Sequence, residues 1–322
     1  MSGSIAFVGI DVSKAHLDVA LLPADSTFRV ANDDDGWADL IARIAGEAPP
    51  CVVLEATGSY HVGVTLALAE AGMPAAVMNP EQTHAFIRSE GQRTKTDRTD
   101  ARLLARFGQQ KQPFPSPVLT QNARDLKELV ACRDDFTKLL TMEKNRLHVA
   151  TDRTRTHHQA VVDYLTAERQ AVDREIAALI AADAALTERH RIVRSAPGIG
   201  VVLGPVVLAG LAELGQDGAK NLASLAGVAP HTRQSGAMRG RSAIGGGRVT
   251  IRKALYQMAV TAVNHDPAMK AHCRQLRLRM PYKVAIIACA RRMLGILNAM
   301  VREGLTWQQT MVGQGQFLPK EA

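Results

Sequence analysis

The sequence predicts an α/β domain at the N-terminus, a long helical connector and a mainly helical C-terminal domain. Over the first hundred residues, short apolar runs alternate with segments of helical spacing. The proline-rich stretch Pro113–Pro117 then excludes both a helix and a central strand. Beyond it, apolar residues recur at spacings of three, four and seven up to about His190. We therefore place the three regions at residues 1–112, 118–190 and 191–322.

The N-terminal region is predicted to follow the order βββαβαβ. Three neighbouring antiparallel strands followed by β/α units are typical of the ribonuclease-H-like fold. A further helix is expected over Thr99–Gln109, after Asn79 and Pro80 end the last strand. The predicted elements are, in order, strands Ile5–Ile10, His16–Leu22 and Phe28–Ala31, helix Trp37–Ile44, strand Cys51–Leu54, helix Tyr60–Ala71 and strand Ala75–Met78.

The connector is predicted to contain two long helices between Asn122 and His190, as in an antiparallel hairpin or coiled coil. Arg133 and Glu143 interrupt its apolar seam, so oligomerisation through the hairpin and a self-packed spacer both remain open. The C-terminal region should be mainly helical, with an irregular loop at Pro230–Thr250. Its Ser195–Gly200 turn resembles a helix-hairpin-helix element, which presents backbone amides to DNA phosphates, although a plain helix start fits equally well.

The overall charge favours a polyanionic partner. The chain carries 39 Lys and Arg against 31 Asp and Glu, a formal net charge of +8, although a solvated basic surface explains this charge equally well. Aromatic residues make up only 4%, which favours phosphate contacts over base stacking. The start has no secretory pattern, and the apolar run Val284–Ala290 is too short to cross a membrane. We expect a cytoplasmic, nucleoid-associated protein without a membrane partner.

Four acidic residues, Asp11, Glu55, Asp97 and Asp100, are candidate metal ligands. Each has an ordinary explanation alone, as a turn cap, a strand-end ion pair or a residue of a first helical turn. In a ribonuclease-H-like sheet, however, their positions converge, and crowded carboxylates require cations such as Mg²⁺ or Mn²⁺. Such ions suit phosphodiester chemistry, and Lys95 beside the last pair could hold the DNA backbone.

A glycine-rich basic loop, His231–Lys253, is the candidate nucleic-acid interface. It contains no acidic residue, and its glycines allow the backbone to approach phosphates closely, although a flexible solvated loop is the alternative. Ser235 is a candidate nucleophile because nearby arginines can stabilise a pentacoordinate phosphorane. No dedicated base is visible, and an ordinary loop serine is the simpler reading. The basic residues are Arg233, Arg239, Arg241, Arg248, Arg252 and Lys253.

These motifs together resemble the IS one-ten family of insertion-sequence transposases, the DEDD transposases, which include pilin-gene invertases. The resemblance covers essentially the whole chain, and the order and spacing of the motifs make it specific. The motifs are Gly9–Lys14, Glu55–Gly58, Asn79–Pro80, Lys95–Ala101, Pro197–Gly200, Ala226–Pro230, Ser235–Gly236, Arg239–Gly240 and Arg252–Tyr256.

The resemblance implies a RuvC-like domain with its DEDD carboxylates at Asp11, Glu55, Asp97 and Asp100, and a transposase domain with its nucleophile at Ser235. In this family the serine becomes joined to a cut DNA strand, and the two sites act together across subunits. Relatives choose double-stranded donor and target DNA by pairing with an element-encoded bridge RNA. We therefore expect a homodimeric or homotetrameric DNA recombinase. The alternatives are a RuvC-like junction endonuclease that uses water and a non-catalytic nucleic-acid-binding protein.

Overall fold

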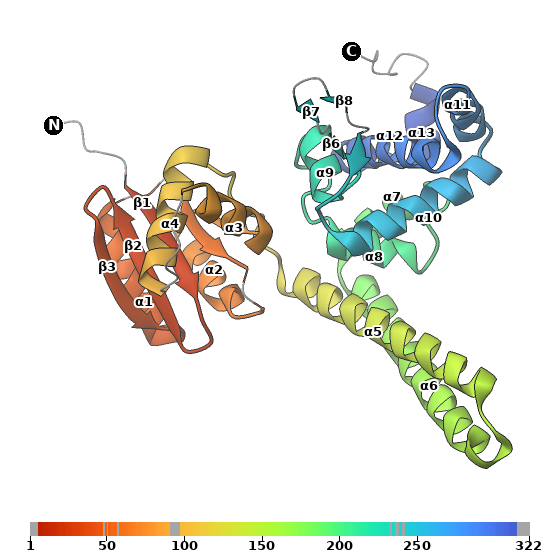
Figure 1. The fold of residues 1–322 in the computed structure, drawn as a ribbon, viewed down its shortest axis with the longest axis horizontal. Coiled ribbons are helices and arrows are strands. Elements are labelled where there is room, and N and C mark those ends of the chain that lie inside the picture. The colour runs from red at the N-terminus through yellow and green to blue at the C-terminus, as the bar shows by residue number, and fades with distance from the viewer. Residues whose placement is uncertain are drawn as a thin grey trace. The chain divides into compact units, whose positions relative to one another are not determined.

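The protein is described from a computed structural model of the 322-residue chain (Figure 1). The structure describes residues 6–47, 49, 51–56, 58–90, 97–231, 234–235, 238–239 and 242–313. At residues 97–98, 234–235, 238–239 and 312–313 it describes the backbone alone. The chain divides into two compact units, Met1–Val118 and Leu119–Ala322, which are treated separately below as unit 1 and unit 2.

Unit 1 is built on a five-stranded mixed sheet with the order β3-β2-β1-β4-β5. The first three strands are antiparallel neighbours, whereas β4 runs parallel to β1 and β5 runs parallel to β4. This arrangement fits the ribonuclease-H-like domain that the sequence predicts. The strands are β1 (Phe7–Val12), β2 (His16–Leu22), β3 (Ser26–Ala31), β4 (Val52–Glu55) and β5 (Ala75–Met78).

Two pairs of helices cover the two faces of this sheet. Helices α1 (Asp34–Ile44) and α2 (His61–Glu70) bury one face, on which Ile10 and Leu54 belong to the larger hydrophobic cluster. Helices α3 (Pro80–Ser89) and α4 (Asp97–Lys111) cover the other face, which carries Val53 and the small residues Gly9 and Ala20. Because side chains alternate along a strand, the acidic residues next to Ile10 and Leu54 lie on the α3–α4 face.

Helix α3 was not predicted from the sequence. Asn79 and Pro80 end strand β5 as predicted, but Asn79 also caps α3 by accepting a hydrogen bond from the Glu81 amide at 2.9 Å. Pro80 is the first helical residue, where its fixed φ and missing N–H are well tolerated. The predicted proline-rich linker also has an unexpected contact, since the Ser116 amide donates to the Ala75 carbonyl at 2.8 Å, beside edge strand β5.

Unit 2 begins with the predicted antiparallel hairpin, formed by α5 (Gln121–Val149) and α6 (Asp152–Ala182). The interruptions of its seam are matched by polar partners. Arg133 donates to Asp173 at 2.5 Å, and buried Glu143 accepts hydrogen bonds from His158 and Arg146. These contacts lower the pKa of the Glu143 carboxyl, chiefly through the bond to His158. The hairpin therefore tolerates charged seam residues because each has a partner.

The rest of unit 2 is mainly helical, and its helices share one core with the near ends of α5 and α6. Helix α12 is long and apolar enough to cross a membrane, but its buried residues Ile286, Met293 and Leu297 belong to this core, which accounts for its composition. The elements are α7 (Ala184–Arg194), α8 (Leu203–Gly210), α9 (Ala219–Leu225), β6 (Pro230–His231), β7 (Gln234–Ser235), β8 (Met238–Arg239), β9 (Ala243–Ile244), α10 (Val249–His265), α11 (Pro267–Arg277), α12 (Tyr282–Glu303) and α13 (Trp307–Gly313).

Candidate functional site

The parallel pairing of β1 with β4 places Asp11 beside Glu55. Ile10 and Leu54 are the last register partners of this pair, so Asp11 and Glu55 follow them at the same level of the sheet. In register, neighbouring residues of parallel strands point to the same face. Both carboxylates therefore lie on the face covered by α3 and α4.

Helix α4 brings its first turn to the same place. A Cβ atom at Gly108 would lie 3.0 Å from Val53 and 4.0 Å from Phe7, whereas one at Gly9 would lie 2.2 Å from the Ala105 nitrogen. The helix thus runs antiparallel to β1. Two strand residues span about the same rise as four helical residues, since the rises are roughly 3.3 and 1.5 Å per residue.

Extending this crossing by two strand residues gives the position of the remaining acidic residues. Gly9 lies opposite the turn that contains Ala101 and Ala105, so Asp11 lies opposite the preceding turn of α4. That turn is the first of the helix: it begins with Asp97 and contains Asp100, which is half-buried. The backbone therefore brings the four predicted positions to one edge of the sheet, although the Asp97 side chain lies outside the described residues.

The Glu55 carboxylate is held by α3. The Thr83 hydroxyl donates to Glu55 Oε2 at 2.6 Å. Thr83 is fully buried, so solvent does not compete for this hydroxyl. His84 Nε2 lies 3.9 Å from Glu55 Oε1. Sequence reasoning missed both residues because it missed α3. The Asn79–Pro80 pair, a cap followed by proline at the first helical position, was the available signal.

A third carboxylate, Asp18, lies next to Asp11 on the same sheet face. Asp18 is the register partner of Asp11 on β2, and Arg29 is the register partner of Asp18 on β3. The buried Asp18 accepts two hydrogen bonds from Arg29, at 3.0 Å from Nε and 2.7 Å from Nη2. This bidentate pair balances one negative charge beside the candidate metal ligands. Sequence reasoning missed Asp18.

The donor chemistry of this edge fits a hard divalent cation. Asp11, Glu55 and Asp100 offer carboxylate oxygens, which Mg²⁺ and Mn²⁺ prefer. Among the side chains that the structure describes, no three His, Cys, Asp or Glu groups approach closely enough to hold one ion together. Asp97 is not among those side chains, and Lys95 lies outside the described residues. The structure thus gives the placement of the ligands along the backbone rather than a closed coordination shell.

The basic loop contains short strands where the sequence predicted irregular chain. Residues Pro230 and His231 pair with Ile244 and Ala243, and further out Ser235 pairs with Met238. Ser235 is therefore the last residue of β7, in a narrow two-stranded sheet with β8. Its side chain and that of Arg239 are not described, and Arg233 and Arg241 lie outside the described residues.

Arg248 and Arg252, both predicted to contact nucleic acid, are engaged within unit 2. Arg248 donates to both carboxylate oxygens of Glu213, at 2.7 and 2.6 Å, and to the Gly210 carbonyl at 2.9 Å. Burial alone would raise the pKa of the Glu213 carboxyl, but the bonds and charge of Arg248 outweigh this and lower it. Arg252 donates to the Gly246 carbonyl at 2.6 Å. Both arginines fasten the end of the basic loop to its own unit.

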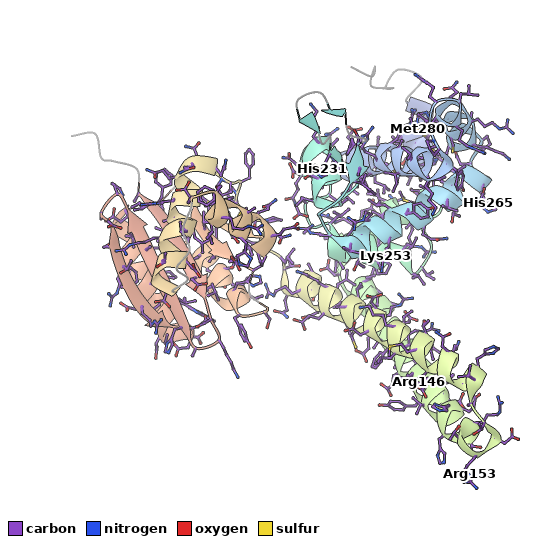
Figure 2. All side chains as sticks on the ribbon, in the orientation of Figure 1. Arg146, Arg153, His231, Lys253, His265 and Met280 are labelled. Carbon is purple, nitrogen blue, oxygen red and sulfur yellow. The ribbon has the colours of Figure 1, made fainter. Side chains whose placement is uncertain are left out.

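Lys253, by contrast, is exposed at the start of α10, where Figure 2 labels it. Within the described part of the chain it forms no ion pair with a carboxylate. The Ser195–Gly200 turn joins α7 to α8. Gly198 has a φ of +85°, and a Cβ atom there would lie 2.5 Å from the Met258 carbonyl oxygen, so only glycine fits. Binding of DNA by this turn stays a prediction.

Comparison with known proteins shows the family to which the chain belongs. Residues 8–156 match a DEDD transposase model of the IS110 type, and residues 190–274 match the Transposase IS116/IS110/IS902 family. The chain belongs to this family. Its members are transposases, so the chain is an enzyme that cuts and rejoins DNA, with the divalent metal dependence that the DEDD group implies.

Two similar proteins align with this chain over nearly their whole length. The pilin gene-inverting protein of Moraxella bovis is 28% identical over 93% of this chain and 97% of its own length, and that of Moraxella lacunata has the same identity and coverage. An uncharacterized protein of insertion element IS110 from Streptomyces coelicolor is 32% identical over 47% of this chain and 39% of its own. Among solved structures, T. thermophilus RuvC in complex with a Holliday junction has a TM-score of 0.28 and 13% identity over 35% of this chain, too low to support an inference.

Proposed function

We propose that this transposase excises and inserts a mobile element, using a carboxylate-held divalent metal site and Ser235 as the nucleophile. One observation carries the metal half of the proposal: Asp11 and Glu55 are neighbours in the parallel register of β1 and β4, opposite the first turn of α4. The two residues are far apart in the sequence, and only the pairing of the two strands brings them together. Asp11, Glu55, Asp97 and Asp100 would hold the cation, with Mg²⁺ favoured and Mn²⁺ able to replace it.

The site's own residues would prepare the DNA for attack. The bound cation supplies positive charge at the scissile phosphate. Thr83 fixes the orientation of Glu55, and the Arg29–Asp18 pair limits the negative charge beside Asp11. Contacts to the DNA backbone from Lys95, Arg233, Arg239, Arg241 and Lys253 would position the strand. The engagement of Arg248 and Arg252 within unit 2 makes their proposed role indirect, through the shape of the loop.

In the serine step, Ser235 Oγ attacks phosphorus and loses its proton while the bond to the leaving deoxyribose oxygen breaks. The leaving oxygen takes up a proton, and the strand stays joined to the protein as a phosphoserine diester. In rejoining, a hydroxyl of the partner strand attacks the same phosphorus and Oγ leaves with a proton. Each step replaces one phosphodiester linkage with another, so the energy of the cut bond is kept in the phosphoserine linkage until rejoining. The place of Ser235 at the end of β7, in the two-stranded sheet of the basic loop, supports access to a DNA strand.

We further propose that the active enzyme is a homodimer or homotetramer assembled through the α5–α6 hairpin. Leu139 and Val161 each precede a buried seam residue of their own helix, and Met142 and Tyr164 follow them by one turn. Because the two helices are antiparallel, all four exposed side chains lie on the same side of the hairpin. Light scattering should show a monomer for the Leu139→Glu/Tyr164→Glu variant, and an unchanged assembly would contradict this part of the proposal.

The guide is proposed to be an RNA encoded by the element. Its support is the family's use of a bridge RNA and the basic charge of the chain. RNA that copurifies with the full-length protein should be sequenced and compared with DNA flanking the gene. Only random cellular RNA in this fraction would contradict the proposal.

The serine mechanism is tested by trapping the protein–DNA adduct under denaturing conditions, with a plasmid that carries the element and its flanks. Wild type should form the adduct, and Ser235→Ala should lose both adduct and recombinant product. Ser242→Ala, at an exposed serine of the same loop, is the matched control and should keep both. Cleavage that persists in Ser235→Ala would establish the alternative, a junction endonuclease that uses water.

The metal half has its own test. Asp11→Asn preserves the size of the side chain but removes its charge, so strand cleavage should fall by roughly 10²-fold or more while DNA binding is retained. Cleavage should also cease in chelator and return with Mg²⁺. Unchanged cleavage by Asp11→Asn would contradict the assigned site. No cleavage by wild type under any metal condition would favour a binding protein without catalysis.

A further inference from the structure

A second basic surface lies outside the serine loop, where α11 turns into α12. Between Asp266 and Glu303 the chain contains no acidic residue. This turn, where Figure 2 labels Met280, presents five exposed basic side chains that no motif had assigned. They are Lys270, Arg274, Arg277, Arg279 and Lys283, called the basic corner below.

The charges of the basic corner are available to a partner. Lys270, Arg274 and Arg277 follow one another at spacings of four and three along α11, so they share one face of the helix. Among the residues that the structure describes, none of the five corner residues forms an ion pair with a carboxylate. This contrasts with Arg248, which is held by Glu213. Unpaired cations on one face indicate a binding surface more strongly than the net charge does.

The corner is presented by rigid elements. Met269 and Cys273 of α11 are buried in the core of unit 2, and Ala285 and Ile286 are buried at the start of α12. The exposed residues therefore have fixed positions relative to the core of unit 2. A surface with fixed charges suits a partner whose own charges are regularly spaced.

The corner also carries apolar groups between its cations. Leu278 is 86% exposed, and Arg277 lies over the ring of the exposed Tyr282 with 5.5 Å from its Cζ to the ring centroid. This cation–π contact covers one face of Tyr282, which reduces its use as a stacking platform for unpaired bases. An exposed leucine flanked by arginines instead suits the groove and sugar edges of a duplex.

We infer that the basic corner docks the phosphate backbone of duplex DNA, at a site separate from the serine loop. From Lys270 to Arg277 the helix rises about 10 Å, a length over which duplex DNA carries roughly six phosphates. Three aligned cations therefore meet an excess of phosphate charge along a single face. The inference rests on the proposed action on DNA, but it concerns binding and does not require the serine chemistry. Its occupant is duplex DNA rather than RNA because the corner offers charges and one apolar tip but few free aromatic faces.

The experiment compares DNA affinity in full-length protein that also carries Ser235→Ala, so that cleavage does not interfere. Fluorescence anisotropy with a labelled duplex spanning the element end is measured across a range of salt concentrations. The triple variant Lys270→Gln/Arg274→Gln/Arg277→Gln should bind on the order of tenfold more weakly or worse, and the slope of log affinity against log salt should decrease by about 2–3. Leu278→Ala should weaken binding without changing that slope.

The matched control removes the same charge from cations that are already paired. Arg43, Arg191 and Arg302 are exposed and form ion pairs with Asp39, Glu188 and Glu303. Their triple change to glutamine should leave the salt slope close to that of the parent. Equal loss in both triple variants, or no loss in the corner variant, would overturn the inference, and unchanged melting temperatures confirm that the proteins fold.

The same titrations with a labelled structured RNA decide between the two polyanions. Loss of RNA binding with unchanged duplex binding would overturn the assignment to DNA. The parent protein separates this result from the proposed function. If the Ser235→Ala parent binds the duplex but wild type never forms the adduct, the serine mechanism fails while the docking surface stands.

Discussion

The carboxylates of unit 1 and the cations of unit 2 form two clusters of charge, which differ in how many of their members have partners within the protein. In unit 1, Glu55 accepts a hydrogen bond from Thr83, and Asp18 is paired with Arg29, both on a sheet face packed against helices. In unit 2, Ser235 lies on a short hairpin, and Arg248 and Arg252 at its base are engaged by their own unit. The five residues of the basic corner have no such carboxylate partners within the described chain.

This difference shows that clustering of like charges in a sequence does not identify the charges that are available to a ligand. A charge paired inside the protein contributes to the stability of the fold, whereas an unpaired one on a rigid surface is available to a partner. The difference between the two clusters can be tested by substitutions that affect packing, pairing and ligand orientation in turn.

The largest effect is expected where α4 crosses β1. Gly9→Ala places a methyl group about 2 Å from backbone atoms of Ala101 and Ala105, which cannot rotate away. The free energy of unfolding should fall by roughly 3 kcal/mol, measured by urea denaturation, and cleavage should fall with it because α4 moves away from Asp11. Gly46→Ala is the control, since nothing lies within 4 Å of its Cβ position. Equal stability of the two variants would mean that α4 does not cross β1 at Gly9.

A smaller effect is expected at the base of the serine loop. Arg248→Gln leaves the largely buried Glu213 carboxylate without its cation, and should cost about 2 kcal/mol of unfolding free energy at neutral pH. Glu213 has a lowered pKa, so the pair stabilises the fold above the ordinary carboxyl pKa of 4.5 and loses this contribution as pH falls through the lowered value. The difference in unfolding free energy between wild type and variant should therefore become smaller at acid pH.

The control for this pair is Lys253→Gln, in the helix that follows Arg248, where Lys253 is exposed and has no carboxylate partner among the described residues. It should change the unfolding free energy by less than about 0.5 kcal/mol. If Arg248→Gln were equally mild at neutral pH, Arg248 would be free for DNA, as the sequence suggested.

The smallest change in stability, with a specific effect on the metal, is expected at Thr83. Thr83→Val keeps the shape of the side chain but removes the hydroxyl that donates to Glu55, at a cost of about 1 kcal/mol. The apparent affinity for Mg²⁺ in cleavage should fall about tenfold because Glu55 loses its orientation. Calorimetric titration with Mn²⁺ gives a readout independent of activity. Thr65→Val, whose hydroxyl bonds only a helix carbonyl, should leave metal affinity unchanged, and equal effects in both variants would remove Thr83 from the metal site.

Most of the fold was predictable because its patterns are local. Strand β2 was predicted with its observed bounds, and the helical spacing from Trp37 to Ile44 and the long hairpin were also recognised. Helix α3 was not predicted because its first residues also mark the end of a strand. The short strands around Ser235 were not predicted because strands of two residues leave no periodic signal.

The sequence by itself determined the order of elements, the family motifs and the acidic and serine candidates, since these depend on residue type and spacing along the chain. Only the tertiary structure decided that Asp11 and Glu55 are neighbours, that Thr83 and Asp18 belong beside them, and that Arg248 is paired while the basic corner is not. Register between strands and the choice of ion-pair partner join residues that are far apart in the chain, and packing rather than local pattern selects them.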